Sequence, residues 1–176
     1  MEISVTDIVS SISLLLAMIG SFFAYFQWRK GVLLKRADYI NELIEKIRSD
    51  DEIREVIYMI DYGEQWYSRE FHLSSELEKK VDKTLSYFSY ICYLKKQKII
   101  SFTEFAFFEY QIERILNNNQ IIDYLYNLYH FSNGFNSAIS FKYLFEYGEK
   151  KNKFNSDFYD NESYLKNKKY HKNIDF

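Results

Sequence analysis

Residues 8–28 read IVSSISLLLAMIGSFFAYFQW and form a run of 21 residues without a charge. At about 1.5 Å per residue, a helix of this length extends roughly 30 Å, the thickness of the hydrocarbon core of a bilayer. A cleaved secretory signal is the alternative, but Glu2 and Asp7 precede the run without any base, and no small-x-small cleavage site follows it before the charges begin. The run therefore predicts a single transmembrane anchor over residues 1–30.

Basic residues immediately follow this run and precede the next acid, Asp38. They are Arg29, Lys30, Lys35 and Arg36. Positive charge collects on the cytoplasmic side of membrane-spanning helices. We therefore expect a membrane protein, in contact with the lipid bilayer, with a very short N-terminus outside and the body in the cytoplasm.

Small and polar residues recur along the run in alternating steps of three and four, which places them on one face of a helix. They are Ser10, Ser13, Ala17, Gly20, Ala24 and Gln27. Small side chains let helix backbones approach closely in a membrane, and serine hydroxyls can hydrogen-bond between helices. This small-residue face predicts a homo-oligomer, in which the face packs against other copies or lines a narrow pore. A monomeric anchor is the alternative.

The remaining chain is predicted to be helical, since the sequence has no proline and only 5 glycines. Apolar residues continue at helical spacing to Ile47, so the anchor helix is expected to run on past Gly31, where it could bend. Asp50 or Asp51 can cap a second helix that ends near Gly63.

Two Ser-x-x-Glu capping boxes then predict the starts of further helices, at residues 75–78 and 101–104. In each box the Ser side chain accepts an early backbone N–H, and the Glu side chain reaches back to the N-cap backbone. The run Asn117–Asn119 predicts a turn before a helix over residues 121–129, and a last helix is expected over residues 138–145.

The predicted fold class is therefore all-α. A transmembrane helix continues into a cytoplasmic helical bundle at residues 31–148, and no segment alternates as a strand would. Residues 149–176 show no apolar period and are expected to form a polar, partly disordered tail.

The overall charge gives no general attraction to nucleic acid, because 23 Lys and Arg face 25 Asp and Glu. RNA or anionic lipid would need a local patch, and the tail has one basic cluster. It comprises Lys166, Lys168, Lys169, His171 and Lys172. The single cysteine, Cys92, excludes a disulfide within the chain and falls on the apolar side of a predicted helix, where we expect a buried, unreactive thiol.

Motifs for catalysis are missing. The three histidines have no metal-ligand spacing and no glycine-rich phosphate loop occurs, so we predict no catalytic, cofactor-binding or metal-binding residue. HEPN ribonucleases, which are also small helical bundles, use an Arg-x4–6-His motif in acid–base cleavage of RNA. Here Arg69 and His72 are separated by only two residues, and Arg114 lies far before His130. His130 and His171 are left as candidate remnants of such a site.

The assembled features resemble a known family. The uncharged span, the basic turn after it and the segments LSYFSYICYL (85–94), FTEFAFFEYQIERILNN (102–118) and DYLYNLYHF (123–131) are similar to the small membrane accessory proteins of type VI-B CRISPR loci, the Csx-twenty-eight family. The resemblance covers most of the chain in size, layout and composition, without a short signature motif.

The resemblance implies a divergent HEPN-like bundle that enhances RNA-guided antiphage defence. It also implies that the membrane of the predicted anchor is the bacterial inner membrane. A functional link to an RNA-targeting CRISPR nuclease and assembly into a pore that depolarises this membrane are implied as well. The absent Arg-x4–6-His motif argues against ribonuclease activity. Two alternatives stay open: a membrane-tethered HEPN-type ribonuclease that uses His130 or His171, and an anchored module that recruits a partner without forming a pore.

Overall fold

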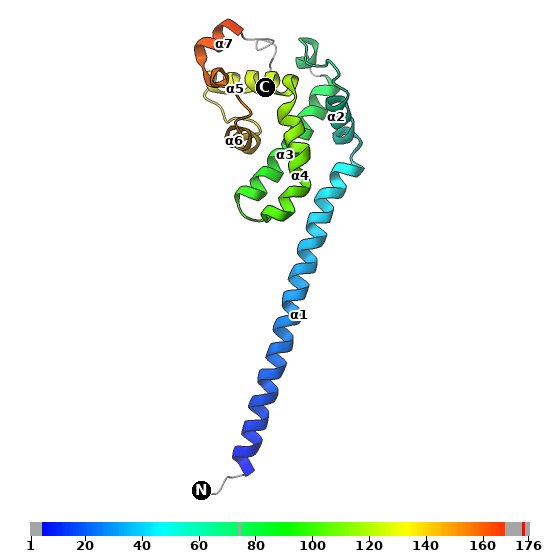
Figure 1. The fold of residues 1–176 in the computed structure, drawn as a ribbon, viewed down its shortest axis with the longest axis vertical. Coiled ribbons are helices and arrows are strands. Elements are labelled where there is room, and N and C mark those ends of the chain that lie inside the picture. The colour runs from blue at the N-terminus through cyan, green and yellow to red at the C-terminus, as the bar shows by residue number, and fades with distance from the viewer. Residues whose placement is uncertain (1–4, 74, 168–173, 175–176) are drawn as a thin grey trace. The chain divides into compact units, whose positions relative to one another are not determined.

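The computed structural model describes residues 5–73, 75–167 and 174. Over these residues every regular element is a helix, which confirms the predicted all-α fold (Figure 1). The elements are α1 (Val5–Ser49), α2 (Asp51–Asp61), the 3-10 helix η1 (Glu70–His72), α3 (Glu76–Lys96), α4 (Phe102–Asn117), α5 (Asn119–Gly134), α6 (Lys142–Lys150), the 3-10 helix η2 (Ser156–Tyr159) and α7 (Asn161–Asn167). The chain divides into two compact units, Met1–Glu45 and Lys46–Phe176, which we describe separately.

The first unit contains most of α1. This helix continues without interruption through Gly31, as the apolar spacing predicted. It is long and apolar enough to cross a membrane, and no residue of its most apolar stretch is buried within the chain. The large apolar side chains between Val9 and Trp28 are all exposed.

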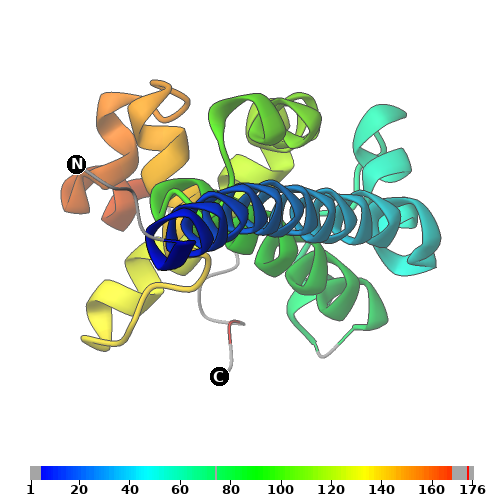
Figure 2. The same cartoon turned by 90° about the horizontal axis from the view of Figure 1, so that it is seen from below.

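The second unit is a helical body organised around α3, which packs against α2, α4 and α6 (Figures 1 and 2). Helix α4 in turn packs against α5. Helices α2 to α6 each bury apolar residues along one side, which is the packing expected of an amphipathic bundle. Fully buried members of this core are Ile53, Val56, Val81, Leu85, Phe88, Ile91, Phe105, Phe108, Ile112, Ile121, Leu125 and Leu144.

Two predicted helix boundaries are set by side-chain caps. The Asp50 carboxylate accepts the backbone N–H groups of Glu52 and Ile53 at 3.2 and 3.3 Å, and so begins α2. Asn118 accepts the backbone N–H groups of Gln120 and Ile121 at 3.0 and 3.1 Å. The predicted turn is thus a single residue, Asn118, which ends α4 and caps α5.

Only one of the two expected capping boxes is complete. Ser101 accepts the Glu104 N–H, and the Glu104 carboxylate accepts the Ser101 N–H at 2.6 Å. Ser75 likewise accepts the Glu78 N–H at 3.0 Å, but the Glu78 carboxylate turns to His72 Nδ1, 3.1 Å away. The prediction was wrong for the second half of this box, because the Glu78 carboxylate binds the buried imidazole of His72, which lies outside the helix.

The last predicted helix starts later than expected. Ala138 lies exposed in the loop before α6, which begins only at Lys142. Phe141 has a left-handed φ of 56° and therefore cannot continue the helix toward Ala138.

The described part of the expected polar tail also differs from the prediction. Residues up to 167 form η2 and α7. Phe158 is buried and stacks on Phe154, with ring centroids 4.4 Å apart. Phe154 lies in an irregular segment and Phe158 lies in a 3-10 helix, so their spacing in the sequence shows no α-helical period.

Gly148 offers a test of this packing. A Cβ at Gly148 would lie 2.7 Å from two ring carbons of Phe154, whose ring is held between Phe145 and Phe158. We expect Gly148→Ala to lower the free energy of unfolding by about 1–3 kcal/mol through overpacking. Thermal unfolding of the detergent-solubilised chain, followed by near-UV circular dichroism, measures the effect.

Gly134→Ala is the matched control. Gly134 is also helical, and a Cβ there would meet nothing within 4 Å. This variant should unfold at the wild-type temperature or slightly above it, since alanine lowers the entropy of the unfolded chain. Equal melting temperatures for the two variants would contradict the proposed close packing.

Candidate functional site

The small-residue face is a property of α1 alone. Ser10, Ser13, Ala17, Gly20, Ala24 and Gln27 all lie within this one helix and all are exposed. A Cβ added at Gly20 would meet nothing within 4 Å. Within one chain the face is therefore open, and its narrow profile could admit a neighbouring helix at short distance.

The basic residues after the span occupy the next two turns of the same helix. Arg29, Lys30, Lys35 and Arg36 are all exposed there. Long basic side chains at the end of an apolar helix can extend into the polar headgroup layer. Their position on a continuous helix is compatible with the expected anchoring role.

His130 is a buried residue of α5. Its Nε2–H donates to the backbone carbonyl of Phe158 at 2.9 Å, and its ring stacks on Tyr164 with centroids 4.3 Å apart. Burial lowers the pKa of His130, while the hydrogen bond to Phe158 opposes this shift. The described contacts of His130 are a carbonyl, an amide side chain and aromatic rings, without a cation that could bind phosphate. They hold η2 and α7 against α5.

The other candidate histidine, His171, lies outside the described residues, as do Lys168, Lys169 and Lys172 of the basic cluster. Arg114, the arginine that precedes His130 in sequence, forms an ion pair with Asp61 of α2. The structure therefore gives Arg114 a partner in the body rather than bringing it to His130.

A different histidine, His72, is the centre of a buried hydrogen-bond chain. Its side chain has 0% exposure. Nδ1 lies 3.1 Å from Glu78 Oε1 and Nε2 lies 3.0 Å from the Tyr67 hydroxyl. The Asn127 amide donates to that same hydroxyl at 2.6 Å.

The Asn127 amide donates to the Tyr67 hydroxyl, and the Glu78 carboxylate can accept a hydrogen bond from His72 Nδ1–H. Burial lowers the pKa of His72 to about 4, which favours a neutral imidazole at pH 7, and burial also raises the pKa of Glu78.

A second buried pair lies beside this chain. The Tyr124 hydroxyl donates to Asp82 Oδ1 at 2.6 Å, and the Tyr124 ring lies 5.7 Å from that of His72. Burial raises the pKa of Asp82 to about 6, although the hydrogen bond from Tyr124 lowers it. Titratable groups with opposite shifts are therefore gathered between η1, α3 and α5.

Gln120 positions the segment between α2 and α3, which carries Tyr67 and His72 of this cluster. The Gln120 carboxamide oxygen accepts the backbone N–H groups of Trp66 and Tyr67, both at 2.7 Å, while its NH2 donates to the Glu64 carbonyl. Gln120 therefore fixes this irregular stretch onto α5. Since the His72 side chain is inaccessible, it cannot meet a substrate in this conformation.

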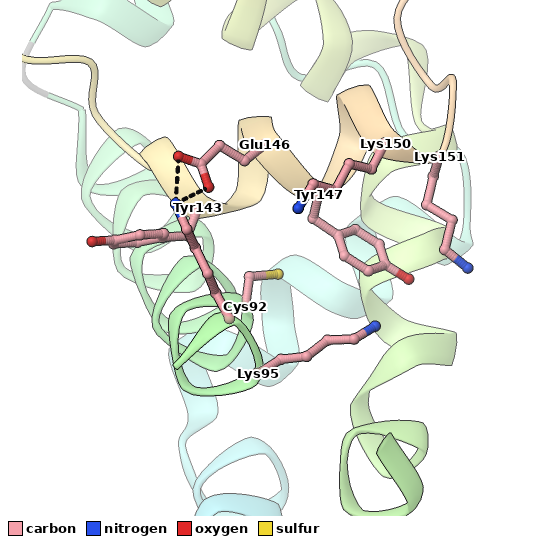
Figure 3. A pocket seen from close by; sticks show the side chains of 8 residues that line it. Cys92, Lys95, Tyr143, Glu146, Tyr147, Lys150 and Lys151 are labelled. Atoms are coloured by element: carbon pink, nitrogen blue, oxygen red, sulfur yellow. Dashed lines mark hydrogen bonds and ion pairs between the residues drawn. The ribbon is translucent and has the colours of Figure 1, made fainter. Parts of the chain in front are cut away.

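Cys92 is buried in α3, as predicted. Burial raises the pKa of its thiol to about 12, so the thiolate is disfavoured at neutral pH. Figure 3 shows its sulfur beside a cavity between α3 and α6. Sequence patterns had marked neither this cavity nor the His72 cluster, because both depend on residues far apart in the chain.

The shifts of His72 and Asp82 predict opposite effects of pH on stability. His72 has its pKa lowered from 6.5 to about 4, so the unfolded chain gains protons first and the free energy of unfolding falls as pH drops through this range. Asp82 has its pKa raised from 3.8 to about 6, so the folded chain gains the proton first and stability rises over nearly the same range. Each effect is on the order of 3 kcal/mol, and in the wild type they oppose one another.

Single variants should separate the two effects. We expect Asp82→Asn, which keeps an acceptor for Tyr124, to be more stable than wild type at pH 7 and to lose stability more steeply from about pH 6.5 to 4. His72→Gln should show the reverse slope. Melting temperatures of the detergent-solubilised chain across this range measure both. Parallel pH profiles for all three proteins would contradict the buried cluster.

A scan against protein-family models and searches of the curated proteins and of the solved structures found no match to this chain. Function has therefore to be proposed from the residues and their geometry.

Proposed function

We propose that this chain is a non-enzymatic, membrane-anchored accessory effector of RNA-targeting CRISPR antiphage defence, which oligomerises through α1 into a pore that depolarises the bacterial inner membrane. The observation that carries the proposal is the exposed small-residue face on a helix long and apolar enough to cross a bilayer. The link to type VI-B CRISPR defence rests on the family resemblance of the sequence.

Close packing would drive the association of α1 more than hydrogen bonding does. An interhelical hydrogen bond in a membrane contributes only about 0.6 kcal/mol on average, so the two hydroxyls of Ser10 and Ser13 supply little. Ala17, Gly20 and Ala24 instead provide three successive positions at which a second backbone could approach. Their substitution by larger residues should therefore disrupt the assembly most.

The orientation follows from the charges. Arg29 and Lys30 would remain in the cytoplasm, and with them the helical body. Gln27, the one strongly polar side chain of the small-residue face, would lie at the cytoplasmic end of the pore. An uncharged lining of Ser, Ala and Gly gives little basis for ion selectivity.

The proposal is tested by the membrane potential of cells that express the chain with an RNA-targeting CRISPR nuclease, before and after the nuclease is activated. We expect depolarisation after activation, reported by a potential-sensitive dye. Ala17→Leu and Gly20→Leu should abolish most of it, because a leucine on the small-residue face keeps neighbouring helices apart.

Ser11→Leu is the matched control, since it adds similar bulk to a small position outside this face. It should retain depolarisation at equal membrane abundance. If depolarisation persists after the whole span is exchanged for an unrelated transmembrane helix, α1 does not form the pore. That result would favour the alternative of an anchored module that recruits a partner. RNA cleavage by the purified chain that is lost in His130→Ala, while the melting temperature is kept, would favour the ribonuclease alternative.

A further inference from the structure

A cavity of about 320 Å³ lies between α3 and α6 (Figure 3). Its apolar part is formed by Cys92 of α3 and by the rings of Tyr143 and Tyr147 of α6. The volume falls at the lower end of the range for small-molecule sites. None of the functions considered above uses this space.

Lysines dominate the charge around the cavity. Four lysines and one glutamate line it. Lys96 is neutralised by Glu146, 2.7 Å away, and Lys151 by Glu109 at 2.9 Å. That leaves Lys95 and Lys150, for which the described residues provide no ion pair, so the cavity carries uncompensated positive charge.

Lys95 is held in place by aromatic rings. Its ammonium lies 3.7 Å from the centroid of Phe105 and 5.0 Å from that of Tyr147. Ring faces attract a cation but offer no lone pair to its N–H donors. Partial burial lowers the pKa of Lys95, and the charges of Lys151 and Lys150 add to this effect against the opposing influence of Glu109. A bound anion would reduce the repulsion among these lysines, and it would accept hydrogen bonds from the ammonium of Lys95.

Both tyrosines of the cavity already have contacts within the body. The Tyr147 hydroxyl already donates to Glu109 at 2.9 Å, and the Tyr143 ring lies 4.9 Å from that of Tyr93. The cavity thus combines aromatic walls with cations from both helices, and in Figure 3 the side chains of Lys95 and Lys150 reach it from opposite sides.

We propose that this cavity binds a nucleoside monophosphate, with the phosphate held by Lys95 and Lys150 and the flat base placed against Tyr143 and Tyr147. A ligand of this class supplies the anion that the lysines lack and an apolar face for the rings, and its size suits the cavity. The site belongs to the helical body and goes beyond the proposed pore, because binding requires no oligomerisation of α1.

Calorimetric titration of the full chain in detergent with AMP tests the site. We expect saturable binding with a Kd below about 1 mM, weakened by added salt because the contacts are ionic. Adenosine lacks the phosphate and inorganic phosphate lacks the ring, so each should bind at least about tenfold more weakly than AMP. Equal binding of either, or no saturable binding of AMP, overturns the proposal.

Two variants locate the ligand. Lys95→Met keeps an unbranched side chain of similar length beside Phe105 and removes the charge, and Lys150→Met does the same at an exposed position. Each should weaken AMP binding at least about tenfold. The control Lys79→Met, at an exposed lysine elsewhere on α3, should bind as wild type does. An equal loss in Lys79→Met, or none in Lys150→Met, rules out this cavity as the binding site.

Discussion

The apolar surface of α1 is the constraint on which the rest of the molecule depends. Twelve large apolar side chains between Val9 and Trp28 are between 46% and 65% exposed. Moving them out of water is worth on the order of 15 kcal/mol, as much as the entire stability of an ordinary domain. No cap or ion pair in the body can offset a penalty of that size, so the apolar surface of this helix favours an apolar environment over water.

The elements that local chemistry determines could be read from the sequence. Asp50, Ser101 and Asn118 are short polar side chains in front of apolar stretches, and each begins a helix where the capping rules place it. The long apolar helix α1 could be predicted for the same reason, because an uncharged run of that length favours a helix able to cross a membrane. Such features need only residues close together in sequence.

The body's buried polar chemistry could not be predicted in this way. Glu78 has the spacing of a capping-box glutamate, yet its carboxylate binds His72. The His72 imidazole is held in place by the Tyr67 hydroxyl, which is in turn bonded to Asn127, 60 positions further along the chain. Phe158 was equally hidden, because its burial comes from Phe154 and His130 and not from a helical period. In both cases contacts between distant parts of the chain determine the outcome, namely the partner of Glu78 and the burial of Phe158, and local sequence does not predict such contacts.

The connectivity around α3 has a kinetic consequence. Its contacts with α2 and α4 join neighbours in the chain, whereas its contact with α6 spans the whole of α4 and α5. Closing a long loop is slower than pairing adjacent helices. The neighbouring helices would therefore pair before α3 meets α6. The walls around Lys95 and Tyr147 would then be completed only after those local contacts have formed.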